Sequence, residues 1–144
     1  VVDALGQVID WHRRHLLPLG ERLTSDARCR LSQGDFFALA AGDGFDIDAP
    51  GRQFDAAIVD IDHSPRELLD PSHAGFYEPA GIQRLARHLR PGGVFSLWSN
   101  DPPDAQYEAA LATAFVDVRA EVVSFESALE GREATNTVYI ARRA

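Results

Sequence analysis

Lysine and methionine are absent from this chain of 144 residues, and cysteine occurs once. The 14 basic residues are therefore all arginine, and against 22 acidic residues they leave a formal net charge of −8. A surface of this charge repels phosphate backbones and anionic lipid headgroups. The composition argues against a nucleic-acid partner and against a membrane partner, and it leaves neutral or cationic small molecules as candidate ligands.

Membrane and export signals are missing as well. No apolar run approaches the roughly 20 residues that a membrane helix needs, and no basic segment precedes an apolar one as in a secretory leader. Cys29 has no partner for an internal disulfide, and its short apolar stretch predicts a small packed residue rather than a nucleophile. We therefore expect a cytoplasmic protein. The start Val1-Val2-Asp3, without methionine, is expected of a fragment or of a non-standard start codon.

Apolar residues account for 45% of the chain, which suffices for a single domain, residues 1–144, around one core. Helices, recognised by apolar residues three and four positions apart, are predicted at residues 5–17, 36–40, 82–89 and 107–115. Strands, recognised by short apolar runs, are predicted at residues 1–2, 28–32, 54–61, 94–98, 116–125 and 135–141.

The order of these elements predicts an α/β fold. Strands and helices alternate, as in a mostly parallel sheet, until the last two strands, which have no helix-length segment between them. A parallel pair needs a crossover of a dozen or more residues, so this final pair is expected to form an antiparallel hairpin. The stretch 42–53 is rich in glycine and aspartate and is predicted to be a surface loop.

The strongest indication of a site is the segment 54–65, FDAAIVDIDHSP. Its apolar run is typical of a parallel strand covered by helices on both faces. Asp60, Asp62 and His63 follow where the strand should end, and in open α/β sheets the ligand crevice lies beyond the carboxyl ends of the strands. We therefore expect the chemistry at this end of the sheet.

Four segments in this order carry a resemblance to a known family. They are VVDAL at residues 1–5, GDF at residues 34–36, FDAAIVD at residues 54–60 and LRPGGV at residues 89–94. Over nearly the whole chain the sequence resembles the spermidine synthase-like, or aminopropyltransferase-like, proteins of the class I S-adenosylmethionine-dependent methyltransferase fold. The resemblance implies a Rossmann-like fold that binds S-adenosylmethionine or its decarboxylated form and transfers a methyl or aminopropyl group to a small-molecule acceptor.

The resemblance also implies a cofactor-binding set. Asp3 matches the acid that holds the ribose hydroxyls, a task that suits a carboxylate because it can accept two hydrogen bonds. Gly34, Asp35 and Phe36 match the loop where an acid receives the adenine amino group and an apolar side chain covers the ring. Ordinary helix capping is the alternative for both Asp3 and Asp35.

Catalytic roles follow from the same resemblance. Asp60 matches the aspartate that orients the attacking amine or accepts its proton, and it also borders the cofactor. Asp62 and His63 are expected to assist it. Asn100 and Asp101, after the next strand, would border the acceptor. No metal ion is expected, although Asp60, Asp62, His63 and His73 together have the chemistry for a divalent ion.

The chain departs from the family pattern in two places. The first family strand and its glycine-rich turn are absent, so the chain looks N-terminally truncated and its two flanking strands lose their shared partner. Because exposed strand edges favour association, we expect a homodimer, with a domain-swapped dimer as one form that it can take. In the typical Asp-x-x-Asp-Pro motif the second acid would stand at position 63, where this chain has His63, which weakens the case for a second cationic nitrogen.

Two other functions stay open at the sequence level. A degenerate or truncated transferase fold can serve as a non-catalytic protein-interaction domain. The acids Asp60 and Asp62 after an apolar strand also suit a haloacid-dehalogenase-type phosphatase, but that fold relies on a downstream lysine, which this chain lacks.

Overall fold

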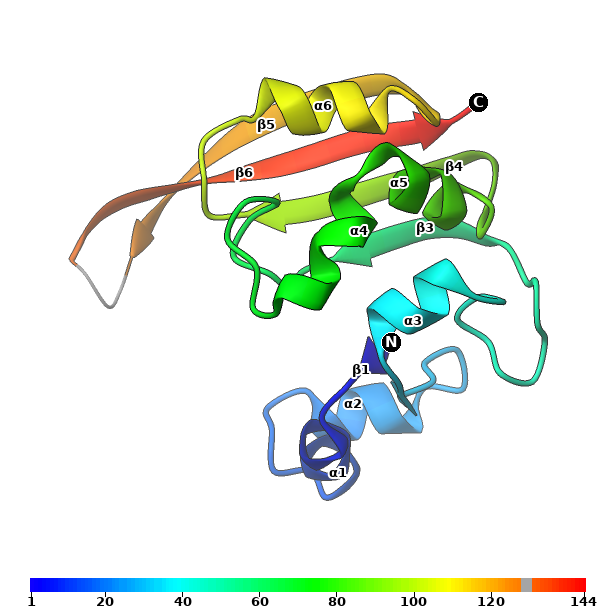
Figure 1. The fold of residues 1–144 in the computed structure, drawn as a ribbon. Helices are drawn as coiled ribbons and strands as arrows, with labels where there is room; N and C mark the ends of the chain where they lie inside the picture. Colours follow the sequence, from blue (N-terminus) through cyan, green and yellow to red (C-terminus); the bar gives the residue numbers. More distant parts are fainter. Residues whose placement is uncertain (128–130) are drawn as a thin grey trace.

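The larger of two sheets contains the last four strands in the spatial order β3-β4-β6-β5. A computed structural model describes residues 1–127 and 131–144 (Figure 1). β3 (Phe54–Val59) is parallel to β4 (Leu89–Ser99), and β6 (Arg132–Arg143) is antiparallel both to β4 and to β5 (Phe115–Ser127). The predicted C-terminal antiparallel pair is confirmed.

The first third of the chain forms a separate, smaller sheet. β1 (Val2–Asp3) pairs in parallel only with β2 (Ser32–Gln33), and the helices α1 (Gly6–Arg13) and α2 (Gly20–Ser25) connect them. α3 (Phe36–Ala41) leads on towards the large sheet. The sheet is therefore split between β1 and β3, as the sequence predicts from the missing family strand.

Helices cover one face of the large sheet. α4 (Ala74–Tyr77), α5 (Pro79–Ala86) and α6 (Ala105–Leu111) lie together in front of it in Figure 1, and a 3-10 turn, Pro71–His73, precedes α4. The core lies between these helices and the sheet. Its fully buried apolar side chains are Ile82, Leu85, Leu89, Phe95, Leu97, Leu111 and Tyr139.

The opposite face of the large sheet carries exposed apolar side chains. Ile58 is 82% exposed, Val94 39% and Phe125 41%. The expectation that the strand at 54–61 is covered on both faces is therefore wrong. This face is exposed because α4, α5 and α6 all pack against the other face of the sheet.

Element boundaries differ most from the prediction near the N-terminus. The helix expected over residues 5–17 ends at Arg13, and a second helix begins at Gly20. The strand expected at residues 28–32 is reduced to two residues, because β2 has only the equally short β1 to pair with. In the part of the chain that the structure describes, no helix is both long and apolar enough to cross a membrane.

Candidate functional site

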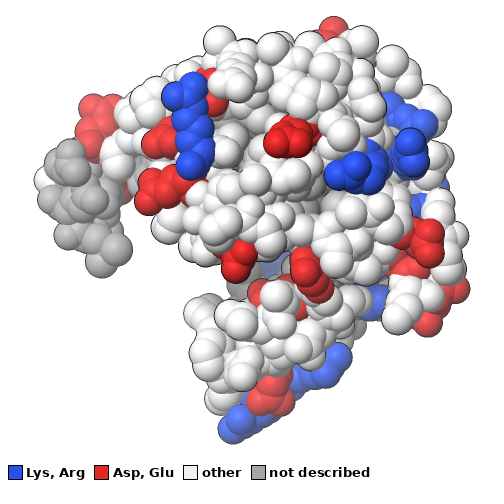
Figure 2. Space-filling view, in the orientation of Figure 1, with Lys and Arg blue, Asp and Glu red and all other residues white. Residues whose placement is uncertain are grey.

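A groove separates the two sheets, and we call it the intersheet groove. Its volume is about 840 Å³, and Figure 2 shows the molecule hollowed between its upper body and its lower lobe. β1 forms one wall and β3 the other. The residues that line it include Val1, Val2, Asp3, Phe36, Phe45, Phe54, Ala56, Ala57, Ile58, Val59, Asp60, Ile61 and His88.

An ionic cluster fixes one end of this groove. The N-terminal ammonium of Val1 donates to the carbonyl oxygen of Arg30 at 2.8 Å, and the Arg30 guanidinium lies 3.1 Å from Asp46. Arg52, just before β3, binds the same carboxylate at 2.8 Å and lies 5.5 Å from the centre of the Phe54 ring. The hydrogen bond from Arg52 holds the pKa of Asp46 below its usual range. These contacts link the start of β1 to the start of β3 through Arg30, Asp46 and Arg52.

Asp3 is the last residue of β1 and Asp60 directly follows β3, so both lie at the carboxyl ends of their strands. One carboxylate oxygen of Asp3 accepts the backbone N–H of Leu5 at 2.7 Å, which leaves the second oxygen for a ligand. Asp60 is exposed directly after β3. Both carboxylates line the groove together with Phe36. The structure thus brings three of the predicted site residues to one cavity.

Asp35 and Gly34 have local structural roles. The Asp35 carboxylate accepts the backbone N–H groups of Phe37 at 2.9 Å and Ala38 at 3.2 Å and so caps α3. The N–H of Gly34 donates to the carbonyl oxygen of Asp3, which extends the pairing of β1 with β2. Neither residue is among those that line the groove. The capping interpretation of Asp35 is therefore realised, and a contact with adenine stays a prediction.

Asp62 is buried and does not line the groove. Its carboxylate accepts the backbone N–H of Leu69 at 2.8 Å and the hydroxyl of Tyr77 at 2.9 Å, and His73 Nδ1 lies 2.9 Å away. Burial, with this hydrogen bond, raises the pKa of Tyr77. The imidazole of His73 also stacks on Phe37, with ring centroids 3.7 Å apart. Asp62 therefore organises the crossover before α5.

His63 joins the residues predicted to border the acceptor. Its carbonyl oxygen accepts the backbone N–H of Asn100 at 2.7 Å, and Asn136 donates to the Asn100 side chain at 2.8 Å. The Ser64 hydroxyl donates to Asp101 at 2.5 Å. Sequence reasoning missed Asn136, whose only signal is a polar side chain near the start of the strand predicted at residues 135–141. Among the described residues no cluster of His, Cys, Asp and Glu has the arrangement of a metal site.

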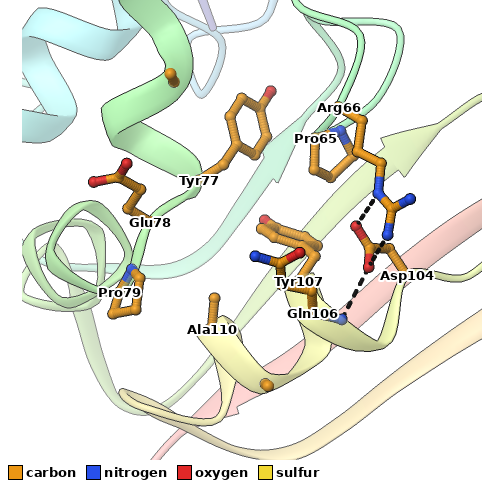
Figure 3. A pocket seen from close by; sticks show the side chains of 11 residues that line it. Pro65, Arg66, Tyr77, Glu78, Pro79, Asp104, Gln106, Tyr107 and Ala110 are labelled. Atoms are coloured by element: carbon orange, nitrogen blue, oxygen red, sulfur yellow. Dashed lines mark hydrogen bonds and ion pairs between the residues drawn. The ribbon is translucent and has the colours of Figure 1, made fainter.

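A second pocket, of about 470 Å³, lies between α4, α5 and α6 (Figure 3). At its rim Arg66 forms a bidentate ion pair with Asp104, in which both N···O distances are 2.7 Å. Asp104 also accepts a hydrogen bond from the backbone N–H of Gln106. These bonds, first of all those from Arg66, lower the pKa of Asp104. The hydroxyl of Tyr107 is buried and has no hydrogen-bond partner among the described residues. No residue predicted for the site lines this pocket.

Solved structures share this fold, although no protein-family model matches the chain. Spermidine synthase from Thermotoga maritima is 15% identical, with a TM-score of 0.62, over 99% of this chain and 43% of that one. The N-methyltransferase NodS from Bradyrhizobium japonicum, in complex with S-adenosyl-L-homocysteine, is 14% identical, with a TM-score of 0.62, over 99% of this chain and 65% of that one. A spermidine synthase in complex with the transition-state analogue AdoDATO is 15% identical, with a TM-score of 0.62, over 99% of this chain and 43% of that one.

These similarities establish the fold. The chain has the Rossmann-like fold of the class I methyltransferases, with a mostly parallel arrangement that ends in an antiparallel hairpin. It spans less than two thirds of the length of each of these three structures. The predicted resemblance to the spermidine synthase-like fold is confirmed at this level.

Proposed function

We propose that the carboxyl end of the intersheet groove binds a nucleoside of the S-adenosylmethionine type and that the protein transfers its alkyl group to a small acceptor. The observation that carries the proposal is the placement of Asp3, the last residue of β1, and Asp60, the first residue after β3, in one cavity. In open α/β sheets this is the position of the ligand crevice. Two of the structural neighbours hold related molecules, S-adenosyl-L-homocysteine and AdoDATO.

The chemistry of the groove fits a cationic nucleoside. The free carboxylate oxygen of Asp3 can accept from a ribose hydroxyl, and Phe36 supplies an apolar surface of the kind that covers a base. A sulfonium is attracted by the exposed Asp60 and by the negative protein as a whole.

Transfer would be an in-line displacement at the carbon next to sulfur. The acceptor's lone pair forms the new bond to carbon while the carbon–sulfur bond breaks and its electron pair stays on sulfur. Asp60 orients the attacking group and takes the proton that it releases. Asp62 acts on this site only by holding His73 and the crossover, while His63, Asn100 and Asp101 border the acceptor.

Calorimetric titration tests the proposal. S-adenosylmethionine, its decarboxylated form and methylthioadenosine are titrated into the wild type and into D3N and D60N. We expect binding by the wild type, at least tenfold weaker binding by D3N, and loss of turnover in D60N. D10N, an exposed carboxylate on α1, is the matched control and should bind like the wild type. Preference for the decarboxylated form would favour aminopropyl over methyl transfer, and no binding by the wild type would refute the proposal.

A non-catalytic interaction domain is the second candidate. The exposed apolar side chains of Ile58, Val94 and Phe125 on one sheet face favour it, because large exposed apolar patches mark interaction sites. The phosphatase alternative has no such support. The expected homodimer stays a prediction, and sedimentation that shows only monomer at micromolar concentration would contradict it.

A further inference from the structure

We propose that the pocket between α4, α5 and α6, which we call the interhelical pocket, binds a neutral aromatic carboxamide whose polar edge pairs with the hydroxyl of Tyr107. The pocket has a volume of about 470 Å³, which is within the usual range for small-molecule sites. It shares no lining residue with the intersheet groove. A ligand bound here would therefore be distinct from the nucleoside of the proposed function.

The three tyrosines of the chain pack against one another beside this pocket, and the hydroxyls of two of them are hydrogen-bonded within the protein. Tyr77 donates to Asp62 at 2.9 Å, and the Tyr139 hydroxyl accepts the backbone N–H of Asp104 at 2.8 Å. Tyr107 is only 3% exposed, and its hydroxyl has no hydrogen-bond partner among the described residues. Burial raises the pKa of Tyr107, so the hydroxyl keeps its proton. A buried hydroxyl without a partner costs free energy, and a ligand that offers an acceptor removes this cost.

The Tyr107 side chain lies inside the pocket rather than at its edge. In Figure 3 it extends from α6 with its hydroxyl on the side of Tyr77 and Pro79, which also line the pocket. Gln106 lies beside it and is exposed, so this side chain is the group that moves aside to admit a ligand. Its amide has both donors and an acceptor, as a carboxamide ligand does. Tyr107 and Gln106 together therefore match the two halves of a carboxamide edge.

The rest of the lining favours a flat aromatic body. The apolar side chains of the pocket are all short or cyclic: Pro65, Ala74, Pro79, Ala109 and Ala110. The rings of Tyr77 and Tyr107 complete the wall. Aromatic rings pack against one another edge to face or with an offset, and both tyrosines offer such surfaces. A rigid ring also loses less conformational entropy on binding than a flexible chain of the same size.

The charged residues of the lining favour a neutral ligand. Arg66 and Asp104 already satisfy each other in their bidentate ion pair at 2.7 Å, so a charged ligand would have to break that pair. Glu78, the third charged residue of the lining, is exposed, and its carboxylate points away from Tyr107 in Figure 3. An ion that enters the apolar part of the pocket loses its hydration without gaining a counter-ion. We therefore expect an uncharged carboxamide to bind in preference to an anion or a cation of the same shape.

A matched series of probes tests the class of ligand. Benzamide is neutral, benzoate is an anion and benzamidinium is a cation, and the three have nearly the same shape. Each is titrated into the wild-type chain, and binding is followed by ligand-observed NMR. We expect benzamide to bind at least tenfold more tightly than either ion. If benzamide does not bind, or if one of the ions binds equally well, the proposal is wrong.

Removal of the Tyr107 hydroxyl separates recognition from packing. Y107F should bind benzamide at least tenfold more weakly than the wild type, because the ligand loses its partner. Without ligand, the Tm of Y107F should be equal to that of the wild type or higher, because no hydrogen bond within the described residues is lost. A lower Tm would show that the hydroxyl has a partner inside the protein, and unchanged benzamide binding would show that it does not contact the ligand. Either result would overturn the proposal.

Two exposed alanines locate the binding site. Ala109 lines the interhelical pocket, whereas Ala112, just after α6, does not. A109W fills the pocket and should abolish benzamide binding, and A112W is the matched control and should bind like the wild type. Equal binding by the two variants would refute this location. All benzamide titrations are made without nucleoside, so their result does not depend on the proposed function, and the nucleoside titrations do not depend on benzamide.

Discussion

At the scale of single residues, Asp60 and Asp62 are two positions apart in the sequence and have different roles. Asp60 is exposed at the groove, whereas Asp62 is buried and accepts hydrogen bonds from Leu69 and Tyr77 beside His73. We predict that D62N lowers the free energy of unfolding by about 2 kcal/mol, because an amide cannot accept from every donor that a buried carboxylate serves. D60N should change it by less than about 0.5 kcal/mol, as exposed substitutions do. Urea unfolding of both variants measures the difference, and equal losses would contradict it.

Asp104 makes stability depend on pH. The ion pair with Arg66 lowers its pKa in the folded protein, so the stabilisation is complete above the unfolded pKa, about 3.9, and is lost as the pH falls through the folded value. D104N keeps a side-chain cap on α6 and loses the charge. We predict that D104N is less stable by about 1 kcal/mol near neutral pH, since Arg66 is largely exposed, and that the difference shrinks below about pH 4. Urea titrations across this range check it, and a difference that grows with acid would refute the assignment.

At the scale of elements, two glycines near the start of α5 respond oppositely to alanine. A Cβ at Gly81 would lie 2.1 Å from the carbonyl oxygen of Gly75 and 2.5 Å from that of Phe76, so α4 and α5 would have to separate. A Cβ at Gly75 meets nothing within 4 Å. We predict that G81A destabilises by about 2 kcal/mol or more, as overpacking does, and that G75A stabilises by up to about 1 kcal/mol, the usual helical preference for alanine. Thermal unfolding of the pair is the measurement, and a stable G81A would mean that the two helices are not packed this closely.

Comparison of the predicted with the observed elements shows which of them a sequence can predict. The long strands β4 and β6 were recognised because their apolar pattern agrees with burial in the core, whereas β5 was recognised although most of its apolar side chains are exposed. β2 was overestimated because its length depends on a partner, β1, that offers only two residues. Of the candidate site, Asp60 followed from its position after an apolar strand, and Asp3 followed from the family resemblance. The burial of Asp62 did not, because it depends on His73 and Tyr77, which the fold brings from the next segment.

At the scale of the whole molecule, the intersheet groove divides the chain into parts of unequal stability. Among residues 1–33 only Ile9 and Gly20 are buried, and the small sheet has two residues in each strand. The large sheet has a continuous core under α5 and α6. The part with few buried apolar contacts should open at a lower free energy than the core.

Amide hydrogen exchange tests whether the small sheet opens at a lower free energy than the large sheet. We predict that the amides of β1, β2 and α1 exchange through local opening, while those of β4 and β6 exchange only when the whole molecule unfolds. Equal protection of both sheets would show that the cluster of Arg30, Asp46 and Arg52 couples them, and the intersheet groove would then be a rigid feature of one cooperative unit.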